Sequence, residues 1–325
     1  MLTRKTIGFI IKIGIVALAL FFLYQQLNVK SGDEKYSVGD IIIKLKDNYI
    51  IVIVVSFMML LNWFLEALKW RFLIAKIENV SVIRSLRAIF SGITVSAFTP
   101  NRIGEYGGRV FCLEKADRIQ AVLITVIGSM AQLLTTIVFG SIGLLFLPDY
   151  LSDFSLFFDK MSFSYPFLAF IIFLLNVILV LLFLNVSVLT NVLTNISFLK
   201  KFEKYNAVFS FYSFEELFKV LAYSVLRYVV FTTQFFILLQ LFEVQILYTD
   251  AIILITSMLF IISVIPTISI TEIGVRGSVA LFLFGLVSNN TVGILSATFV
   301  LWVINLLIPS LIGIVFIFTL KFFRK

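Results

Sequence analysis

The segments Glu105-Tyr106-Gly107-Gly108-Arg109 and Glu272-Ile273-Gly274-Val275-Arg276 both read Glu-x-Gly-x-Arg. They lie 167 positions apart in a chain of 325 residues, so each half of the chain carries one copy. Each copy follows a proline, Pro100 or Pro266, by five or six residues. The sequence around them is apolar enough to form helices in hydrocarbon. These charged, glycine-containing breaks are therefore the natural place to look for function.

The composition predicts a polytopic membrane protein. Hydrophobic residues make up 61% of the chain and charged residues 14%, whereas a soluble protein of this size needs more polar surface. The formal net charge is +8, but the basic residues form short clusters between apolar runs, as the positive-inside rule describes. We therefore expect no nucleic-acid partner.

The chain has no histidine and a single cysteine, Cys112. A disulfide within the chain is excluded, and so are a histidine-based metal site and a Ser-His triad. The phosphate-binding pattern Gly-x4-Gly-Lys-Ser/Thr is also absent. The sequence therefore predicts no metal site, no cofactor and no catalytic residue, and indicates a protein that is not an enzyme.

Long apolar runs predict about six spanning helices. We expect them at Ile7–Leu27, Tyr49–Ala67, Ile119–Leu147, Pro166–Val188, Leu217–Phe242 and Thr291–Leu320. The loops between them alternate between basic and acidic, which places the basic loops and both termini in the cytoplasm. This pattern predicts an integral protein of a bacterial or archaeal cytoplasmic membrane.

Two shorter apolar runs are broken by proline, and we expect them to form re-entrant helical hairpins near 88–115 and 251–287. The run before Pro100 is about eleven residues, roughly 17 Å as helix, which is half a bilayer. Thr99 and Pro100 suit the N-cap and first position of the next helix. The predicted fold is an all-α polytopic membrane protein with two inverted-topology repeats, 1–165 and 166–325, as secondary transporters use.

Charged residues at membrane depth are costly and face partners or a wet path. In each Glu-x-Gly-x-Arg segment the i, i+4 spacing puts Glu and Arg on one helix face. The pairs are either self-neutralising ion pairs or parts of a site. In the second case helix N-termini and arginines would bind phosphate, and the glutamates would meet an ammonium group or carry a proton. The candidate substrate-binding residues are Asn101, Arg102, Glu105, Arg109, Arg227, Glu272 and Arg276.

The stretch from Ser91-Gly92 through Phe98-Thr99-Pro100-Asn101-Arg102-Ile103-Gly104-Glu105, with Arg109, resembles the signature of the lysylphosphatidylglycerol synthase transmembrane-region family. The second segment, at 272–276, resembles the Pro…Glu-x-Gly pattern of that family's second half. The resemblance implies translocation of aminoacylated or other polar-headed phospholipids between leaflets, with membrane phospholipids as partners. These 325 residues hold no soluble aminoacyl-transferase domain, so we do not expect synthesis of lysylphosphatidylglycerol, and the cargo stays open.

Three alternatives remain at this point. Broken helices would equally serve a secondary transporter of a small soluble substrate. An intramembrane enzyme acting on a lipid-linked substrate is disfavoured because histidine is missing and the outside aspartates are scattered. A scaffold for a separate lipid-modifying enzyme is the third alternative.

Overall fold

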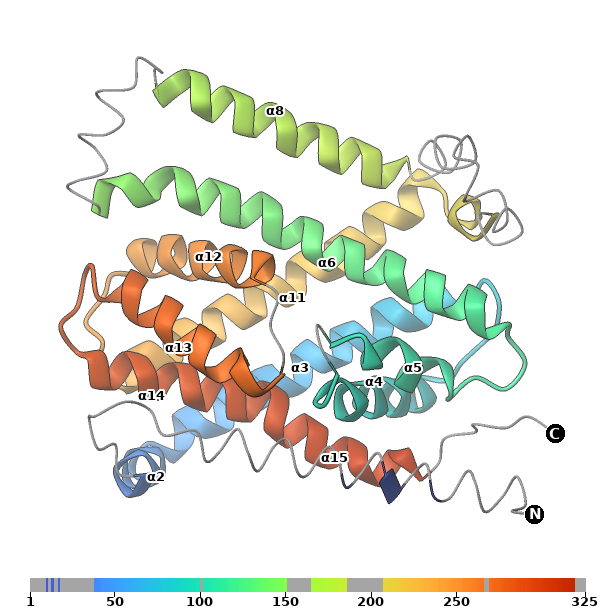
Figure 1. Cartoon of the computed structure of the whole chain (residues 1–325), viewed down its shortest axis with the longest axis horizontal. Helices are drawn as coiled ribbons and strands as arrows, with labels where there is room; N and C mark the ends of the chain where they lie inside the picture. The colour runs from blue at the N-terminus through green and yellow to red at the C-terminus, as the bar shows by residue number, and fades with distance from the viewer. Residues whose placement is uncertain are drawn as a thin grey trace.

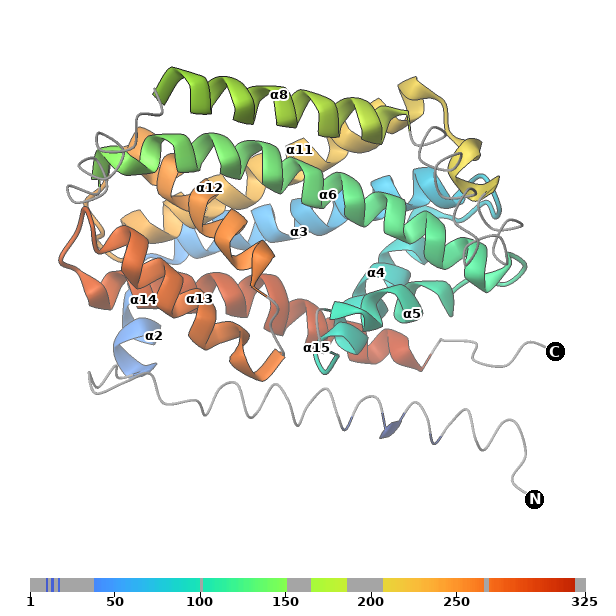
Figure 2. The ribbon, with the colours of Figure 1, turned by 45° about the horizontal axis from the view of Figure 1, so that its top comes forward.

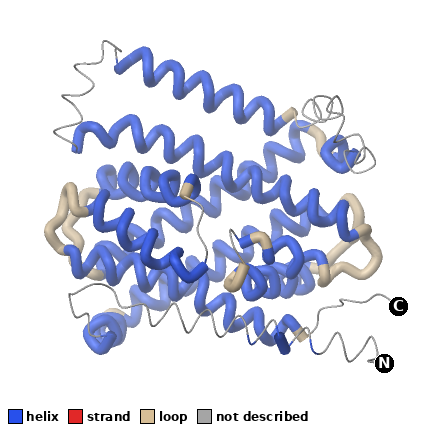
Figure 3. Tube along the Cα trace, in the orientation of Figure 1, coloured by secondary structure: helices blue, strands red, loops and turns tan. Residues whose placement is uncertain are grey.

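The computed structural model describes residues 38–99, 102–150, 165–185, 207–265 and 269–318, together with positions 10, 13, 14 and 17. These residues form helices joined by loops and turns, with no β-strand among them (Figure 3). This agrees with the all-α prediction. The helices are α2 Val38–Asp47, α3 Tyr49–Ile74, α4 Val82–Ser96, α5 Gly104–Val110, α6 Arg118–Phe146, α8 Tyr165–Leu184, α11 Phe214–Leu241, α12 Tyr248–Val264, α13 Ser269–Phe284, α14 Thr291–Trp302 and α15 Ile308–Ile317.

Five helical segments in the described residues are long and apolar enough to cross a membrane. Four are the single helices α3, α6, α8 and α11, and the fifth is Thr291–Ile317, in which one π-helical turn joins α14 to α15. They correspond to five of the six expected spans. The remaining one, Ile7–Leu27, lies almost wholly outside the described residues.

The second span is longer than the sequence predicts. We expected it to end at Ala67 and to be followed by a basic loop, but α3 continues to Ile74 and carries Glu66 and Lys69 inside it. The helix continues because Lys69 neutralises Glu66 one turn away, with 2.7 Å between Nζ and Oε2. A paired charge can remain in an apolar helix, whereas an isolated one is expensive there.

The short helix that follows the first proline break begins later than predicted. Helix α5 starts at Gly104 rather than at Pro100, because Arg102 has a left-handed backbone with φ 57° that interrupts the helix. Thr99 still acts on this helix end, since its Oγ1 accepts a hydrogen bond from the Gly104 amide at 2.8 Å. Pro100 itself lies outside the described residues.

Each proline-broken region contains a pair of helices, α4 with α5 and α12 with α13. Figures 1 and 2 show the two pairs toward opposite ends of the molecule, with the C-terminal end of α12 and the N-terminal end of α13 turned toward α4 and α5. The connection between the pairs is direct, because Arg102 at one turn bonds Glu272 of α13. The two regions that carry the repeated sequence therefore meet in space.

Helices from the first half of the chain pack against helices from the second half. Helix α3 packs against α11, α4 packs against α15, and α12 packs against α6. Glycine makes two of these contacts close: Gly313 of α15 lies against Phe90 of α4, and Gly140 of α6 lies against Phe260 of α12. Small residues allow helix backbones to approach closely where lipid provides no hydrophobic drive. Helix α8 stays at the periphery, on α6 and α11 (Figure 1).

Candidate functional site

Three polar side chains lie at the midpoints of three long helices. Asn62 is 13 positions after the start of α3 and 12 before its end. Gln132 is 14 positions from either end of α6, and Arg227 is 13 and 14 positions from the ends of α11. At 1.5 Å per residue each lies about 20 Å from a helix end. If these helices cross a bilayer, the three side chains lie near its middle.

Arg227 joins these three helices. Its Nε donates to Asn62 Oδ1 at 3.0 Å and its Nη1 donates to Gln132 Oε1 at 3.1 Å. The same Nη1 forms an ion pair with Glu66 of α3, and the guanidinium lies 5.4 Å from the centre of the Trp63 ring. Arginine suits such a position because its planar fork can satisfy several acceptors and an aromatic face together.

Glu66 is the common anion of three cations. Its Oε1 accepts from Arg109 Nη1 at 2.8 Å, and its Oε2 contacts both Lys69 Nζ and Arg227 Nη1. Lys69 also donates to the Gly128 carbonyl oxygen and to Ser224 Oγ, at 3.2 and 3.3 Å. Glu66, Lys69 and Arg109 are all buried. This cluster ties α3, α5 and α11 together inside the helix bundle.

The first Glu-x-Gly-x-Arg segment belongs to this buried cluster. Arg109 forms the expected i, i+4 pair with Glu105, and its second amino group reaches Glu66. Its side chain is only 3% exposed. The pair is therefore not self-contained, because Arg109 divides its two amino groups between its own helix and α3.

The second segment has a different partner. Glu272 forms the expected i, i+4 pair with Arg276, at 3.0 Å from Nε and 2.9 Å from Nη2. Arg102 Nη2 donates to the same oxygen, Oε1, at 2.7 Å. Three guanidinium nitrogens thus converge on one carboxylate oxygen of a side chain that is 7% exposed.

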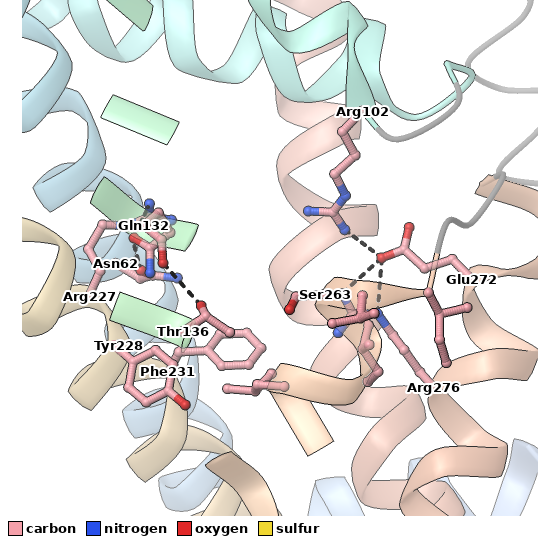
Figure 4. A pocket seen from close by; sticks show the side chains of 14 residues that line it. Asn62, Arg102, Gln132, Thr136, Arg227, Tyr228, Phe231, Ser263, Glu272 and Arg276 are labelled. Carbon is pink, nitrogen blue, oxygen red and sulfur yellow. Dashed lines mark hydrogen bonds and ion pairs between the residues drawn. The ribbon is translucent and has the colours of Figure 1, made fainter. Parts of the chain in front are cut away.

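A cavity of about 560 Å³ separates the two charged groups. Figure 4 shows Arg227, Asn62 and Gln132 on one side and Arg102, Glu272 and Arg276 on the other, with Ser263 between them. Further polar lining comes from Thr136 and Tyr228, and the apolar lining comes from Phe231, Leu259, Ile262, Val264 and Ile265.

The cavity has a positive lining. Three arginines and one glutamate contribute a formal net charge of +2. The four charged residues behind the wall, Glu66, Lys69, Glu105 and Arg109, sum to zero, so they leave this excess unchanged. An uncompensated positive lining at this depth calls for an anionic ligand.

The predicted site residues divide into two groups. Arg102, Arg227, Glu272 and Arg276 all line the cavity. Glu105 and Arg109 are paired with each other and do not line it. Asn101 lies outside the described residues.

Sequence reasoning missed the buried partners on α3. The expected span ends at Ala67, which leaves Lys69 beyond it, and neither Asn62 nor Glu66 is among the candidate residues. A signal was present, because positions 62, 66 and 69 follow helical spacing and share one face. Gln132 is also absent from the candidate residues, although it accepts an interhelical hydrogen bond from Arg227 and lines the cavity.

Metal ligation has no support among the residues that the structure covers, where no three His, Cys, Asp or Glu side chains are grouped to hold an ion. The charged groups present are guanidinium, ammonium and carboxylate, and they suit the binding of an anion or the exchange of ion-pair partners.

Comparison with known proteins identifies one family. The model of the lysylphosphatidylglycerol synthase TM region matches residues 9–313, which is most of the chain. No curated protein and no solved structure gives a significant match. The family and the long apolar helices together make this an integral membrane protein. The chain belongs to the lysylphosphatidylglycerol synthase TM region family, a membrane domain associated with lipid modification or flipping.

Proposed function

We propose that the protein moves a phospholipid with a polar head between the leaflets of a membrane. The observation that carries this proposal is the cavity of about 560 Å³ at the level of the helix midpoints, lined by three arginines. A phosphodiester is an anion that arginine binds through paired N–H donors. A headgroup crossing the bilayer needs such a polar site near the middle, because hydrocarbon alone does not solvate it.

The apolar part of the lining favours a lipid over a small soluble substrate. Val264 and Ile265, at the end of α12, line the cavity and are 66% and 37% exposed. In a bilayer these side chains would form an apolar edge beside the polar site. Acyl chains could stay in the hydrocarbon at this edge while the headgroup enters the cavity. A transporter of soluble molecules has no need for such an edge.

The charged contacts suggest how a headgroup would enter. Arg102 and Arg276 share one oxygen of Glu272. A lipid phosphate offers these guanidinium groups new acceptors, so it can take the place of Glu272 at one or both. Because Arg102 lies at the turn of one helix pair and Glu272 lies on the other, phosphate binding would weaken the contact between the two regions.

The two halves would then act as inverted repeats, 1–165 and 166–325, with the helix pairs as re-entrant hairpins. The reciprocal packing of α4 on α15 and of α12 on α6 supports this arrangement. Rocking of one repeat against the other would open the cavity to each leaflet in turn. We place the protein in a cytoplasmic membrane with its termini inside, and movement would be facilitated or gradient-driven.

The test is lipid movement in liposomes containing the purified protein. A fluorescent phospholipid is placed in the inner leaflet, and its arrival outside is followed with a membrane-impermeant quencher. We expect the double variant Arg102→Gln/Arg276→Gln to slow movement by about tenfold or more, the factor that 1.4 kcal/mol represents.

Lys44→Gln is the control, because it removes a positive charge from a pair with Glu243, and neither of these residues lines the cavity. Equal rates in wild type and the double variant would contradict the proposal. Uptake of an anionic solute without any lipid movement would instead support a transporter of soluble substrates. Changed lipid products in membranes that contain the protein would indicate an enzyme.

A further inference from the structure

We infer that the π-helical turn Val303–Leu307 in the last span is a hinge, at which α15 bends relative to α14. The inference rests on the proposed function, because it locates the place where the chain flexes when the two halves move against each other. Three observations carry it: the backbone of this span, the helices that pack on its two parts, and the buried polar atoms at the turn.

The sequence itself prevents a continuous α-helix at this point. Pro309 lies 18 positions after the start of the span Thr291–Ile317 and eight before its end. Proline has no backbone N–H, so the carbonyl oxygen of Asn305, four positions earlier, cannot receive its α-helical hydrogen bond. The chain widens into the π-helical turn and resumes as α15 with Pro309 in its first turn. Helices bend sharply at prolines and at π-helical turns, and here the two coincide.

The two parts of this span pack on different halves of the chain. Helix α14 packs on α13 and α11 of the second half, whereas α15 packs on α4 of the first half. Figure 1 shows the same division, with α13 beside α14 and α4 beside α15. When the two halves move, α14 follows one and α15 follows the other. The turn between them therefore has to bend.

Helix α15 is fixed closely on α4. A Cβ on Gly313 would lie 2.1 Å from the Phe90 carbonyl oxygen, so the two backbones touch. Thr94 Oγ1 donates to the carbonyl oxygen of Ser310, the residue after Pro309, at 2.7 Å. This attachment begins directly after the proline, which leaves the bending to the residues before it.

The turn itself is attached to the second half through Asn305. Its Nδ2 donates to Gln234 Oε1 of α11 at 2.9 Å, and Gln234 Nε2 donates to the Val55 carbonyl oxygen at 2.8 Å. Asn305 lies 14 positions after the start of the span and 12 before its end, so it is about 20 Å from either end. The polar residues of the cavity lie at the same level in their own helices. A bend at this turn therefore acts at the depth of the cavity.

Two buried polar atoms beside Pro309 have no hydrogen-bond partner among the described residues. They are Asn305 Oδ1 and Ser310 Oγ. Asn305 Nδ2 already donates to Gln234 and to the Leu301 carbonyl oxygen, so the missing bond belongs to the Asn305 oxygen alone. A buried polar atom without a partner is costly. A bent arrangement of the turn that supplies these partners would recover that cost, which gives the turn a second state of comparable free energy.

The ion pair between Arg102 and Glu272 opposes the bend. Arg102 lies just before α5, which packs on α4, and Glu272 lies on α13, which packs on α14. The pair therefore connects the two moving parts at a place other than the hinge. When an anion takes Arg102 from Glu272, this connection is lost and the turn can bend.

The first experiment measures the bend as a distance between two spin labels. One label replaces Val315 on α15, the other replaces Phe218 on α11, both exposed, and Cys112→Ser removes the single native thiol. Asn305 is 12 positions from the end of α15, so a bend of about 20° moves that end by roughly 6 Å. We expect a second distance, shifted by about this amount, to become populated when Arg102→Gln is added.

The matched control is a label pair at Ile83 and Val315, because α4 and α15 move together and should keep one distance. Lys44→Gln is the control for the lost charge, since Lys44 does not line the cavity. A single unchanged distance between Phe218 and Val315 in Arg102→Gln would overturn the inference. An equal shift in both label pairs would also overturn it, because α15 would then have left α4.

The second experiment stiffens the turn. Pro309→Ala supplies the missing amide donor and favours a continuous α-helix. We expect it to remove the second distance from Arg102→Gln. Alone, it should slow phospholipid movement in liposomes by about tenfold or more, because the bending step then limits the rate. Pro166→Ala is the matched control, because Pro166 is the second residue of α8, where a proline costs no hydrogen bond. A second distance that persists in Arg102→Gln/Pro309→Ala would contradict the hinge.

These outcomes separate the hinge from the function on which it rests. A second distance in Arg102→Gln, with no phospholipid movement by the Cys112→Ser chain, would uphold the hinge and overturn translocation. Phospholipid movement at an undiminished rate in Pro309→Ala would uphold translocation and overturn the hinge.

Discussion

The two Glu-x-Gly-x-Arg segments have the same pattern and different surroundings. In the first, Arg109 is 3% exposed and bonds Glu66 behind the cavity wall. In the second, Arg276 is 19% exposed and lines the cavity. The first segment thus stabilises the bundle while the second contributes to the candidate site. A repeated motif fixes which side chains pair within a helix, but the neighbouring helix decides what the pair does.

The residue before the arginine explains the difference. The first segment has Gly108 there, and a Cβ at this position would lie 2.5 Å from Gly92 Cα of α4. Helix α5 therefore lies directly on α4. The second segment has Val275 at the same place, and its motif glycine, Gly274, has no atom within 4 Å of a Cβ built on it. Helix α13 is not pressed against α12 in this way.

The motif glycine itself is tight in neither copy. A Cβ on Gly107, the counterpart of Gly274, would meet only one ring atom of Phe111, at an ordinary 3.8 Å. Close approach is instead confined to Gly104 and Gly108, where a Cβ would lie within 3 Å of the backbone of α4.

The largest expected effect of a single substitution is on the buried cluster. Glu66→Gln removes one charge and leaves Lys69, Arg109 and Arg227 buried without their shared anion. We expect a loss of about 3–5 kcal/mol, the range for breaking a buried ion pair. The measurement is thermal unfolding in detergent, or folded yield if the variant does not purify. Glu272→Gln, beside the open cavity, should cost much less, and equal losses would remove the distinction between the two segments.

The second effect tests the close packing of α5 on α4. Gly108→Ala places a methyl group against the backbone of Gly92, which cannot move aside as a flexible side chain can. We expect destabilisation of about 1–3 kcal/mol, typical of overpacking, seen as a lower unfolding temperature. Gly107→Ala is the matched control on the same helix, because its new methyl group has room. If both variants behave alike, the contact is not tight.

The third substitution is expected to stabilise the protein rather than destabilise it. Gly274 lies within α13 and has open space around it, so Gly274→Ala gains helix propensity without a clash. We expect stabilisation of about 0.5–1 kcal/mol. Differential scanning fluorimetry would show this as a small rise in unfolding temperature. A fall instead would mean that α13 needs this glycine for a motion or a ligand, which would make the second segment more specialised than its static packing suggests.

The smallest expected effect concerns how each helix pair is anchored. The loop before α4 holds the loop after α5 through Glu78, which accepts hydrogen bonds from the Glu114, Lys115 and Ala116 amides. The loop after α13 is held by Asn290, whose Nδ2 donates to the Phe242 and Glu243 carbonyl oxygens. The two anchors occupy corresponding places, but the side chain that makes the bonds is titratable in the first and an amide in the second.

Partial burial works to raise the pKa of Glu78, but the three backbone amides outweigh it and hold the pKa below its ordinary value of 4.5. A lowered pKa in the folded state stabilises the protein above the unfolded pKa, and this contribution is lost as pH falls below about 4.5 through the folded value. We expect the difference in unfolding temperature between wild type and Glu78→Gln to shrink over that range. The difference between wild type and Asn290→Ala should stay constant. A constant Glu78 difference would show that its charge does not matter.

Much of this protein followed from its sequence. Apolar runs of bilayer length predicted α6, α8, α11 and the final span, since burying that much hydrocarbon leaves few other folds in a membrane. The i, i+4 spacing predicted the Glu105–Arg109 and Glu272–Arg276 pairs, because helix geometry alone brings such positions together. The resemblance of the first motif region pointed to the family that the comparison identified.

What only the tertiary structure decided is which charges meet across helices. Glu66 joins Arg109 and Arg227, which lie 43 and 161 positions away, and Arg102 reaches Glu272 over 170 positions. No local spacing encodes such contacts, because they depend on which helix faces pack and how closely glycine lets them approach. The same packing buries Arg109 of the first Glu-x-Gly-x-Arg segment and leaves Arg276 of the second segment in the lining of the cavity. Helix geometry therefore set the pairs, and packing set their roles.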